Sequence, residues 1–292
     1  MDETPVTYEQ LIERFVAWAQ DRPDIHAALV LGSRARNDHP ADEWSDLDIV
    51  VIVADPTPYL ASADWLANCG EVWVTFLEAT AAGGGMERRA LFAGGLDVDF
   101  AILPYAQAEE MARLGLPPAV VEIFRRGVRV LLDRNGLITR DFTRLSPLTA
   151  PITSLTAAAF QETAHDFWYH AVWTAKKLRR GELWTAKTCC DGVMKGLLLK
   201  ALEAHARAAS GGQRDTWHDG RFLEEWADPR AVAALAATFA DYDQASVWRA
   251  LTATMALFRW LTQETAGLLG FPYPATADRR ATELVEALSP GV

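Results

Sequence analysis

Two carboxylates spaced by one residue, Asp46 and Asp48, stand at the start of the hydrophobic, β-branched run 47–53. Alternate side chains of a β-strand point to the same face, so this spacing places the two carboxylates side by side. Neighbouring carboxylates repel each other unless a cation lies between them. Oxygen-only ligands suit Mg²⁺, which commonly carries substrate phosphates. Two such aspartates on their own can also mark a solvated strand end, so the residues that precede them decide between the two interpretations.

A Gly-Ser turn precedes the pair by about a dozen residues and follows the short apolar run 28–31. Gly32 allows the backbone to approach a phosphate closely, and Ser33 can offer both a hydroxyl and an amide. Arg34 and Arg36 compete for a bidentate contact with a phosphate, and Arg34 is close enough to the turn to be structural instead. Strand, Gly-Ser, loop and paired carboxylates in this order together predict a site for a metal-bound phosphate group.

A third carboxylate is expected from residues 97–103, where Asp97 and Asp99 repeat the one-residue spacing at the start of another strand. Alternation puts both on one face, so spacing alone does not choose between them. Asp99 runs directly into an apolar segment, as Asp48 does, and we take it as the deeper residue; Asp97 is expected near solvent at the strand end. We predict that Asp46, Asp48 and Asp99 are catalytic and bind two Mg²⁺ ions, with Asp99 either a metal ligand or also the base.

The elements that must hold these residues divide into two kinds. Residues 7–20 have the apolar spacing of a helix that begins at Thr7, and strands are expected at 28–31, 47–53, 71–77, 97–103 and, at an edge, 128–132. After Pro147 and Pro151 the strand pattern ends, and helices are expected within 152–209, with a turn at 180–181, and at 221–240, 243–269 and 277–288. The fold class is therefore α/β: an α/β domain, 1–148, followed by an all-α domain, 149–292.

Composition narrows the classes of partner. The 292 residues are half hydrophobic and carry a net charge of −11, which argues against a nucleic-acid partner and allows a cationic acceptor. Acidity that merely keeps the protein in solution explains the charge equally well. No membrane-length apolar run or signal-peptide pattern is visible, so no membrane partner and a cytoplasmic location are expected. The three cysteines lack metal or disulfide spacing.

Longer segments extend the pattern over almost the whole chain: LGSRARNDHPADEWSDLDIVV, LDVDFAILP, HDFWYHAVWTAKKLRRGELWTAK and ALTATMALFRWLTQETAGLLGFPYP. With them the chain resembles the aminoglycoside 6-adenylyltransferases, the streptomycin-modifying branch of the polymerase-β-like nucleotidyltransferase superfamily. The resemblance implies an enzyme in which the first domain, 1–148, is a catalytic nucleotidyltransferase domain with a mixed sheet, and the second, 149–292, is a helical bundle that binds substrate. The active site would lie in the cleft between the two domains. The resemblance also implies ATP as co-substrate, Mg²⁺ as cofactor, transfer of AMP to a hydroxyl of a streptomycin-like aminoglycoside, release of pyrophosphate, and antibiotic resistance.

The same resemblance extends the site into the helical half. Lys187 is predicted to bind nucleotide together with Gly32, Ser33, Arg34 and Arg36, although a surface lysine is the plain alternative. Acceptor-binding residues are predicted on the helices that carry the FW and GELWTAK segments, namely Asp166, Trp168, Trp173 and Asp191. A polycationic acceptor needs carboxylates and flat aromatic faces, while most tryptophans of a helical protein belong to its core.

Two other possibilities stay open at this point. The acceptor could be another small molecule such as a lincosamide, or the chain could be a catalytically silent relative that only binds nucleotide. The presence of all three aspartates favours the enzyme. The protein is expected to be a monomer or a homodimer.

Overall fold

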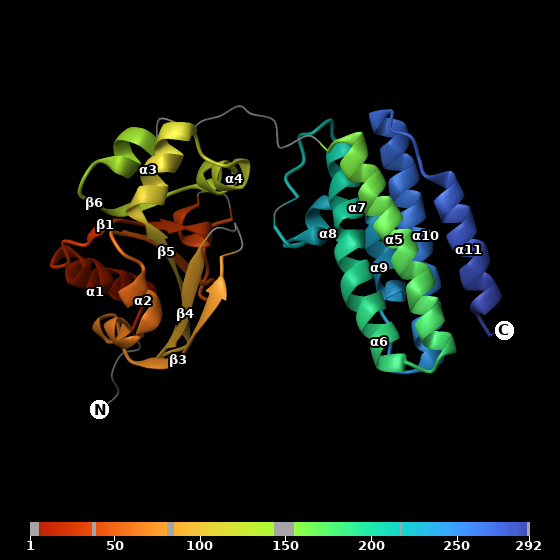
Figure 1. The fold of residues 1–292 in the computed structure, drawn as a ribbon, viewed down its shortest axis with the longest axis horizontal. Helices are drawn as coiled ribbons and strands as arrows, with labels where there is room; N and C mark the ends of the chain where they lie inside the picture. The colour runs from red at the N-terminus through yellow and green to blue at the C-terminus, as the bar shows by residue number, and fades with distance from the viewer. Residues whose placement is uncertain (1–5, 37–38, 81–84, 143–154, 217, 291–292) are drawn as a thin grey trace. The chain divides into compact units, whose positions relative to one another are not determined.

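The computed structural model describes residues 6–36, 39–80, 85–142, 155–216 and 218–290. The chain forms two compact units, residues 1–150 and 151–292 (Figure 1), and each is described here by itself. The domain boundary predicted at residue 148 lies outside the described residues.

The first unit is built on a six-stranded sheet with the strand order β3-β4-β5-β2-β1-β6. Its strands are β1 (Ile25–Leu31), β2 (Leu47–Val53), β3 (Val72–Ala79), β4 (Met86–Phe92), β5 (Leu96–Pro104) and β6 (Arg129–Asp133). The central pair β2–β5 is parallel and the other pairs are antiparallel, so the sheet is mixed, as predicted. The predicted edge strand at 128–132 is β6.

The two faces of the sheet have different covers. On one face α1 (Tyr8–Gln20) buries Leu11 and Phe15 in a cluster that includes Ile49 of β2 and Phe100 of β5. Thr7 begins α1 with a capping box, as the sequence predicts. On the other face a smaller cluster that contains Ile52 packs against α3 (Tyr105–Leu114). Asp48 and Ile52 are four residues apart on β2, and alternate side chains of a strand point to the same face. Asp48 therefore lies on this second face, beyond the end of the apolar cluster.

Strand β4 and the helices α3 and α4 (Pro118–Arg126) are absent from the prediction. Two adjacent arginines, Arg88 and Arg89, interrupt the hydrophobic pattern of β4, so that pattern does not predict a strand there. Arg88 is nevertheless buried, because its guanidinium donates to the backbone carbonyls of Tyr59, at 3.1 Å, and Leu60. These bonds satisfy a buried charge that the amino-acid type alone would place in solvent. Two short helical segments, α2 (Thr57–Ala61) and η2 (Asp64–Asn68), connect β2 to β3.

The second unit is a helical bundle. Its elements are α5 (Ala157–Arg179), α6 (Leu183–Thr188), the π-helical η5 (Cys189–Val193), α7 (Met194–Ala209), α8 (Leu223–Trp226), α9 (Pro229–Leu235), η6 (Ala236–Thr238), α10 (Gln244–Leu269) and α11 (Ala275–Leu288). The predicted turn at 180–181 is confirmed, and Gly181 has a φ of 74° there. The single helix predicted at 221–240 is wrong: Asp228 caps α9 and Pro229 starts it, which ends α8 before them.

Aromatic and ionic contacts fix the helices of the bundle. Phe167 of α5 stacks on Phe258 of α10 with ring centroids 3.6 Å apart. Arg259 of α10 holds Asp278 of α11 through hydrogen bonds of 2.7–2.9 Å. No described helix combines the length and hydropathy needed to cross a membrane.

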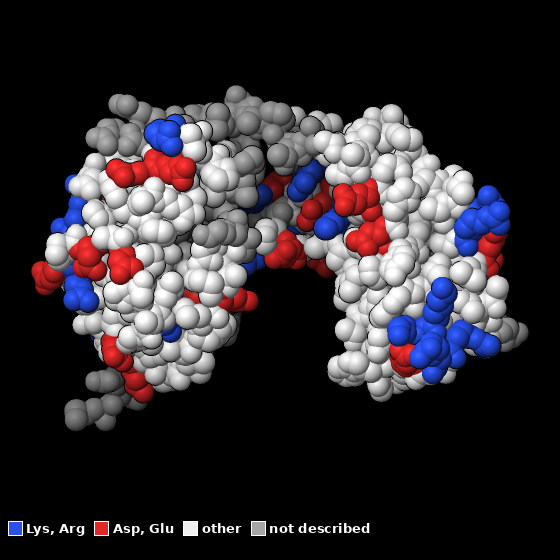
Figure 2. Space-filling model, viewed as in Figure 1, with Lys and Arg blue, Asp and Glu red and all other residues white. Residues whose placement is uncertain are grey.

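The acidic net charge is not spread evenly over the surface. Figure 2 shows Lys and Arg gathered at one end of the bundle, where the last turn of α5 and the residue after it carry Lys176, Lys177, Arg179 and Arg180. Cations at a helix C-terminus interact favourably with the helix dipole, which accounts for this cluster without a ligand.

Candidate functional site

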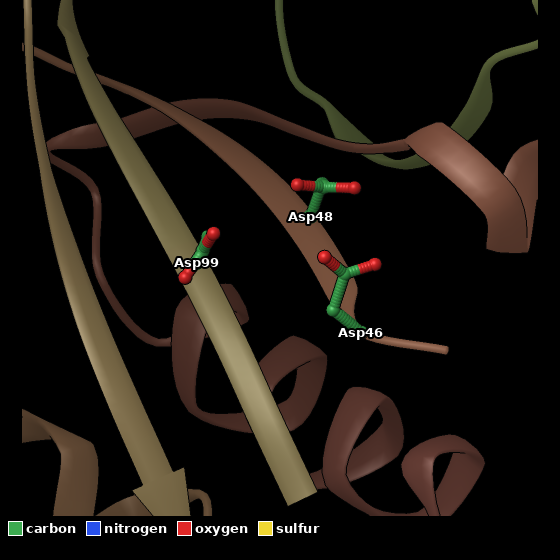
Figure 3. A group of neighbouring side chains, drawn as sticks. All are labelled: Asp46, Asp48 and Asp99. Atoms are coloured by element: carbon green, nitrogen blue, oxygen red, sulfur yellow. The ribbon is translucent and has the colours of Figure 1, made fainter. Parts of the chain in front are cut away.

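Three aspartates converge at one end of the second sheet face. Asp46, Asp48 and Asp99 each offer an oxygen atom, and these atoms all lie within 4.8 Å of one another (Figure 3). Asp48 and Asp99 are direct neighbours in the parallel β2–β5 pairing, and Asp46 precedes β2 by one residue. Strand alternation buries Leu47 on the opposite face, where it belongs to the core. The structure thus brings together the three carboxylates that the sequence singled out.

Like charges dominate this site. Burial raises the pKa of Asp99, and the carboxylates of Asp46 and Asp97 raise it further, whereas Arg89 opposes the shift. Burial also raises the pKa of Asp97, again with a contribution from Asp46. Asp97 lies two residues before Asp99 on the same face of β5 and is more exposed than Asp99, as predicted. Such crowding disfavours the ionised forms until a cation compensates them, which is the donor set that a hard divalent ion requires.

The Gly-Ser turn lies against this cluster. Gly32 has a φ of +66°, and a Cβ atom at this residue would lie 2.1 Å from Oδ2 of Asp48. Glycine is therefore required both by the backbone conformation and by the approach of the carboxylate. The Oγ atom of Ser33 is buried and has no hydrogen-bond partner among the described residues. An orphaned hydroxyl beside a carboxylate cluster fits a phosphate oxygen held with a metal ion.

The two arginines after the turn differ in their surroundings. Arg34 donates from Nε to the carbonyl of Asp46 at 2.9 Å and from Nη2 to the carbonyl of Ser45 at 2.6 Å, and its guanidinium lies 3.5 Å from the ring centroid of Tyr8. Arg34 thus fixes the loop that presents Asp46. Arg36 follows the 3₁₀-helix η1 (Gly32–Ala35) as its C-terminal cap residue. Contact of either arginine with a nucleotide stays a prediction.

Strand β4 adds an ion pair that the sequence analysis missed. Arg89 lies directly opposite Asp99 in the β4–β5 pairing, and its Nη2 atom is 2.5 Å from Oδ2 of Asp99. The Nε atom of the same guanidinium lies 3.2 Å from Glu87 and 3.4 Å from Glu78. The spacing of Glu87 and Arg89 indicates that the two side chains share one face of a strand. Nothing in the sequence, however, indicates that β4 pairs with β5.

On the helical unit, Lys187 and Asp191 form an ion pair one turn apart, and Lys187 also donates to the carbonyl of Ala240 at 2.5 Å. The Nζ atom of Lys195 lies 4.0 Å from the other Asp191 oxygen, and its side chain is only 11% exposed. Burial lowers the pKa of Lys195. Both predicted residues are therefore partly buried and paired, as the shared helix face predicted, and Lys195 is a third member that the sequence analysis did not name.

The remaining predicted acceptor residues lie on α5. Asp166 is about half exposed, and its carboxylate lies 2.8 Å from Nδ1 of His170. Partly buried Trp173 lies under the ammonium group of Lys177, with Nζ 5.1 Å from the ring centroid. Trp168 is only 2% exposed and packs edge-on against Phe258 in the core of the bundle. A core position leaves no ring face for an acceptor, so Trp168 is corrected to a structural residue.

Comparison with known proteins places these observations in a family. The family model described as streptomycin adenylyltransferase matches residues 6–288. An aminoglycoside 6-adenylyltransferase of Bacillus subtilis (strain 168) is 22% identical over 274 residues, which cover 91% of this chain and 92% of the relative. One from Campylobacter jejuni is 22% identical over 252 residues, 83% and 82% of the two chains. The crystal structure of an aminoglycoside 6-adenyltransferase from Bacillus subtilis is 19% identical, with a TM-score of 0.45 over 97% of this chain and 99% of that one.

Proposed function

Since the chain belongs to the streptomycin adenylyltransferase family, we propose that it transfers AMP from ATP to a hydroxyl group of a streptomycin-like aminoglycoside and so confers resistance to that antibiotic. The observation that carries this proposal is the convergence of Asp46, Asp48 and Asp99 within 4.8 Å of one another beside the Gly32–Ser33 turn. Both features suit a metal-bound triphosphate, and the identity of the acceptor rests on the family.

In the proposed reaction the acceptor hydroxyl oxygen forms a bond to the α-phosphorus of ATP, and the bond from that phosphorus to the oxygen bridging to the β-phosphorus breaks. Pyrophosphate leaves, and the hydroxyl proton passes to a carboxylate. Asp46, Asp48 and Asp99 would hold Mg²⁺, and Mg²⁺ when bound would supply charge neutralisation on the phosphates. Gly32 and the orphaned hydroxyl of Ser33 would position the phosphates.

Two carboxylates compete for the proton. Burial and the carboxylate of Asp46 raise the pKa of both Asp97 and Asp99, but Asp99 is held by Arg89, whereas Asp97 is more exposed. A raised carboxylate pKa improves a base that works near neutral pH. Asp97→Asn and Asp99→Asn should therefore be compared for turnover and for Mg²⁺ affinity: the base variant loses turnover with metal binding kept, and the ligand variant loses both.

The helical unit is proposed to supply the acceptor site. Asp166 carries the most weight, because its carboxylate is about half exposed and lies beside the imidazole of His170; Trp173 offers a partly exposed ring. Asp191 is a weaker candidate, since two lysines already compensate its charge. Asp166→Asn should raise the KM for streptomycin with ATP binding little changed.

Lys187 is proposed to release its ion-pair partner Asp191 and to bind the phosphates of ATP in its place. Lys187→Ala should weaken ATP affinity more than acceptor affinity in titration calorimetry. The reverse order of effects would assign the lysine to the acceptor or to the helix pairing alone.

The decisive experiment is incubation of the protein with MgATP and a panel of aminoglycosides and lincosamides, followed by mass spectrometry for an added AMP. Streptomycin should gain AMP, and Asp46→Asn should not transfer it. AMP on a lincosamide alone would keep the chemistry and change the acceptor. Nucleotide binding without transfer to any acceptor would identify a catalytically silent relative.

A further inference from the structure

We propose that Arg89 is a positioning residue of the catalytic cluster: it holds Asp99 for catalysis and, by its charge, limits how tightly the cluster binds a divalent cation. This inference rests on the proposed function, because it assigns a second task to the same metal site. Arg89 comes from β4, a strand that contributes none of the three predicted metal ligands.

One of the two carboxylate oxygens of Asp99 is engaged by Arg89. Nη2 of Arg89 lies 2.5 Å from Oδ2 of Asp99, within the range of a charge-assisted hydrogen bond. The side chain of Asp99 is only 14% exposed, so the guanidinium is its main access to a counter-charge from the protein. A carboxylate held at one oxygen keeps the direction of the other one, which reduces the rotation that a metal ligand must lose on binding.

Two further carboxylates attract the guanidinium from its other side. Nε of Arg89 lies between Glu87, at 3.2 Å, and Glu78, at 3.4 Å. Glu78 and Glu87 are direct neighbours in the β3–β4 pairing, so they form a second acidic pair behind the arginine. Arg89 therefore lies between this outer pair and the catalytic cluster, with carboxylates of β3, β4 and β5 around its guanidinium.

The charge of Arg89 and the hydrogen bond that it donates to Asp99 have opposite consequences for the reaction. A cation this close to Asp99 repels a divalent ion in the same cluster, which lowers metal affinity. The hydrogen bond to Asp99 orients a ligand, which favours turnover. Removal of Arg89 should thus tighten metal binding and slow catalysis, whereas loss of a merely structural residue would weaken both together.

The test measures these two quantities separately. Arg89→Gln should bind Mg²⁺ with a Kd lower by roughly three- to tenfold in calorimetry without substrate, at low ionic strength, while kcat at saturating Mg²⁺ falls at least about tenfold. Arg89→Lys keeps the charge and loses the planar fork, so its Kd should match the wild type and its kcat should be intermediate. Arg14→Gln removes the same charge from an exposed site on α1 and should change neither quantity.

Thermal melting of each variant in EDTA checks that the fold is kept. Unchanged or weaker Mg²⁺ binding by Arg89→Gln, or a kcat equal to the wild type, would overturn the inference. A wild-type protein that transfers no AMP but shows the predicted shift in Mg²⁺ affinity would sink the proposed function and leave the charge effect of Arg89 standing. A wild type that transfers AMP, together with an Arg89→Gln variant whose Mg²⁺ affinity and kcat are unchanged, would keep the proposed function and overturn the role of Arg89.

Discussion

Asp46→Asn should make the first unit more stable at neutral pH although it abolishes turnover. The carboxylate oxygens of Asp46, Asp48 and Asp99 come within 4.8 Å of one another. Two unit charges at this separation repel by about 1 kcal/mol in water-like surroundings and by about 3 kcal/mol at an effective dielectric constant near 20. The three residues are only partly buried, so the lower figure applies. Removal of one charge relieves two of the three repulsions, about 2 kcal/mol in total.

The pH dependence provides a sharper test than the size of the gain. Burial and neighbouring carboxylates raise the pKa values of Asp97 and Asp99. A raised carboxyl pKa favours the folded state at acid pH, and this contribution is lost as the pH rises through the folded pKa. The advantage of Asp46→Asn should therefore be full at pH 7 and shrink toward about pH 4, where carboxyl groups take up protons.

Scanning calorimetry in EDTA at low salt would measure the effect. The melting transition of the first unit should rise by roughly 4–8 °C at pH 7, and salt should reduce the gain by screening. Mg²⁺ should stabilise the wild type more than the variant, because binding to the folded state adds stability. Glu13→Gln makes the same change of charge at an exposed site on α1 and should leave the transition in place. A variant no more stable than the wild type in EDTA, or a gain independent of pH, would refute the repulsion argument.

Three further variants test other parts of the structure. Gly32→Ala should abolish AMP transfer and cost at least about 1 kcal/mol in urea unfolding, because its Cβ would displace the carboxylate of Asp48; normal activity would contradict the described turn. Arg34→Met should lose about 2 kcal/mol in the same assay, with ATP affinity changed less than kcat; a selective loss of ATP affinity would instead make Arg34 a nucleotide ligand. Asp278→Asn should lower the free energy of unfolding of the helical unit by about 2 kcal/mol, after allowance for partial exposure of Arg259, and with it the melting temperature. Burial opposes ionisation of Asp278, but hydrogen bonds from Arg259 and Tyr273 outweigh it and lower its pKa, so the wild-type advantage should be present above about pH 4 and disappear as the pH falls through the folded pKa; a difference that persists at pH 2 would point to packing.

The sequence alone determined the features that depend on neighbours along the chain. Period-two alternation put Asp46 and Asp48 on one face, the capping box began α1 at Thr7, and glycine marked the turn at residue 181. Helical spacing also placed Lys187 and Asp191 together. In each case the physical cause acts over four residues or fewer, and such causes are visible without a fold.

Tertiary structure alone decided which strands and helices meet. The pairing of β4 with β5 brings Arg89 to Asp99, and only the packing of α5 on α10 shows that Trp168 is a core residue. The reach of Arg34 to the carbonyl of Asp46 depends likewise on a loop closing across twelve residues. Strand order and helix contacts are chosen by the burial of the whole core, a sum over residues distant in sequence. The carboxylates could therefore be predicted from the sequence, whereas the cation that holds one of them could not.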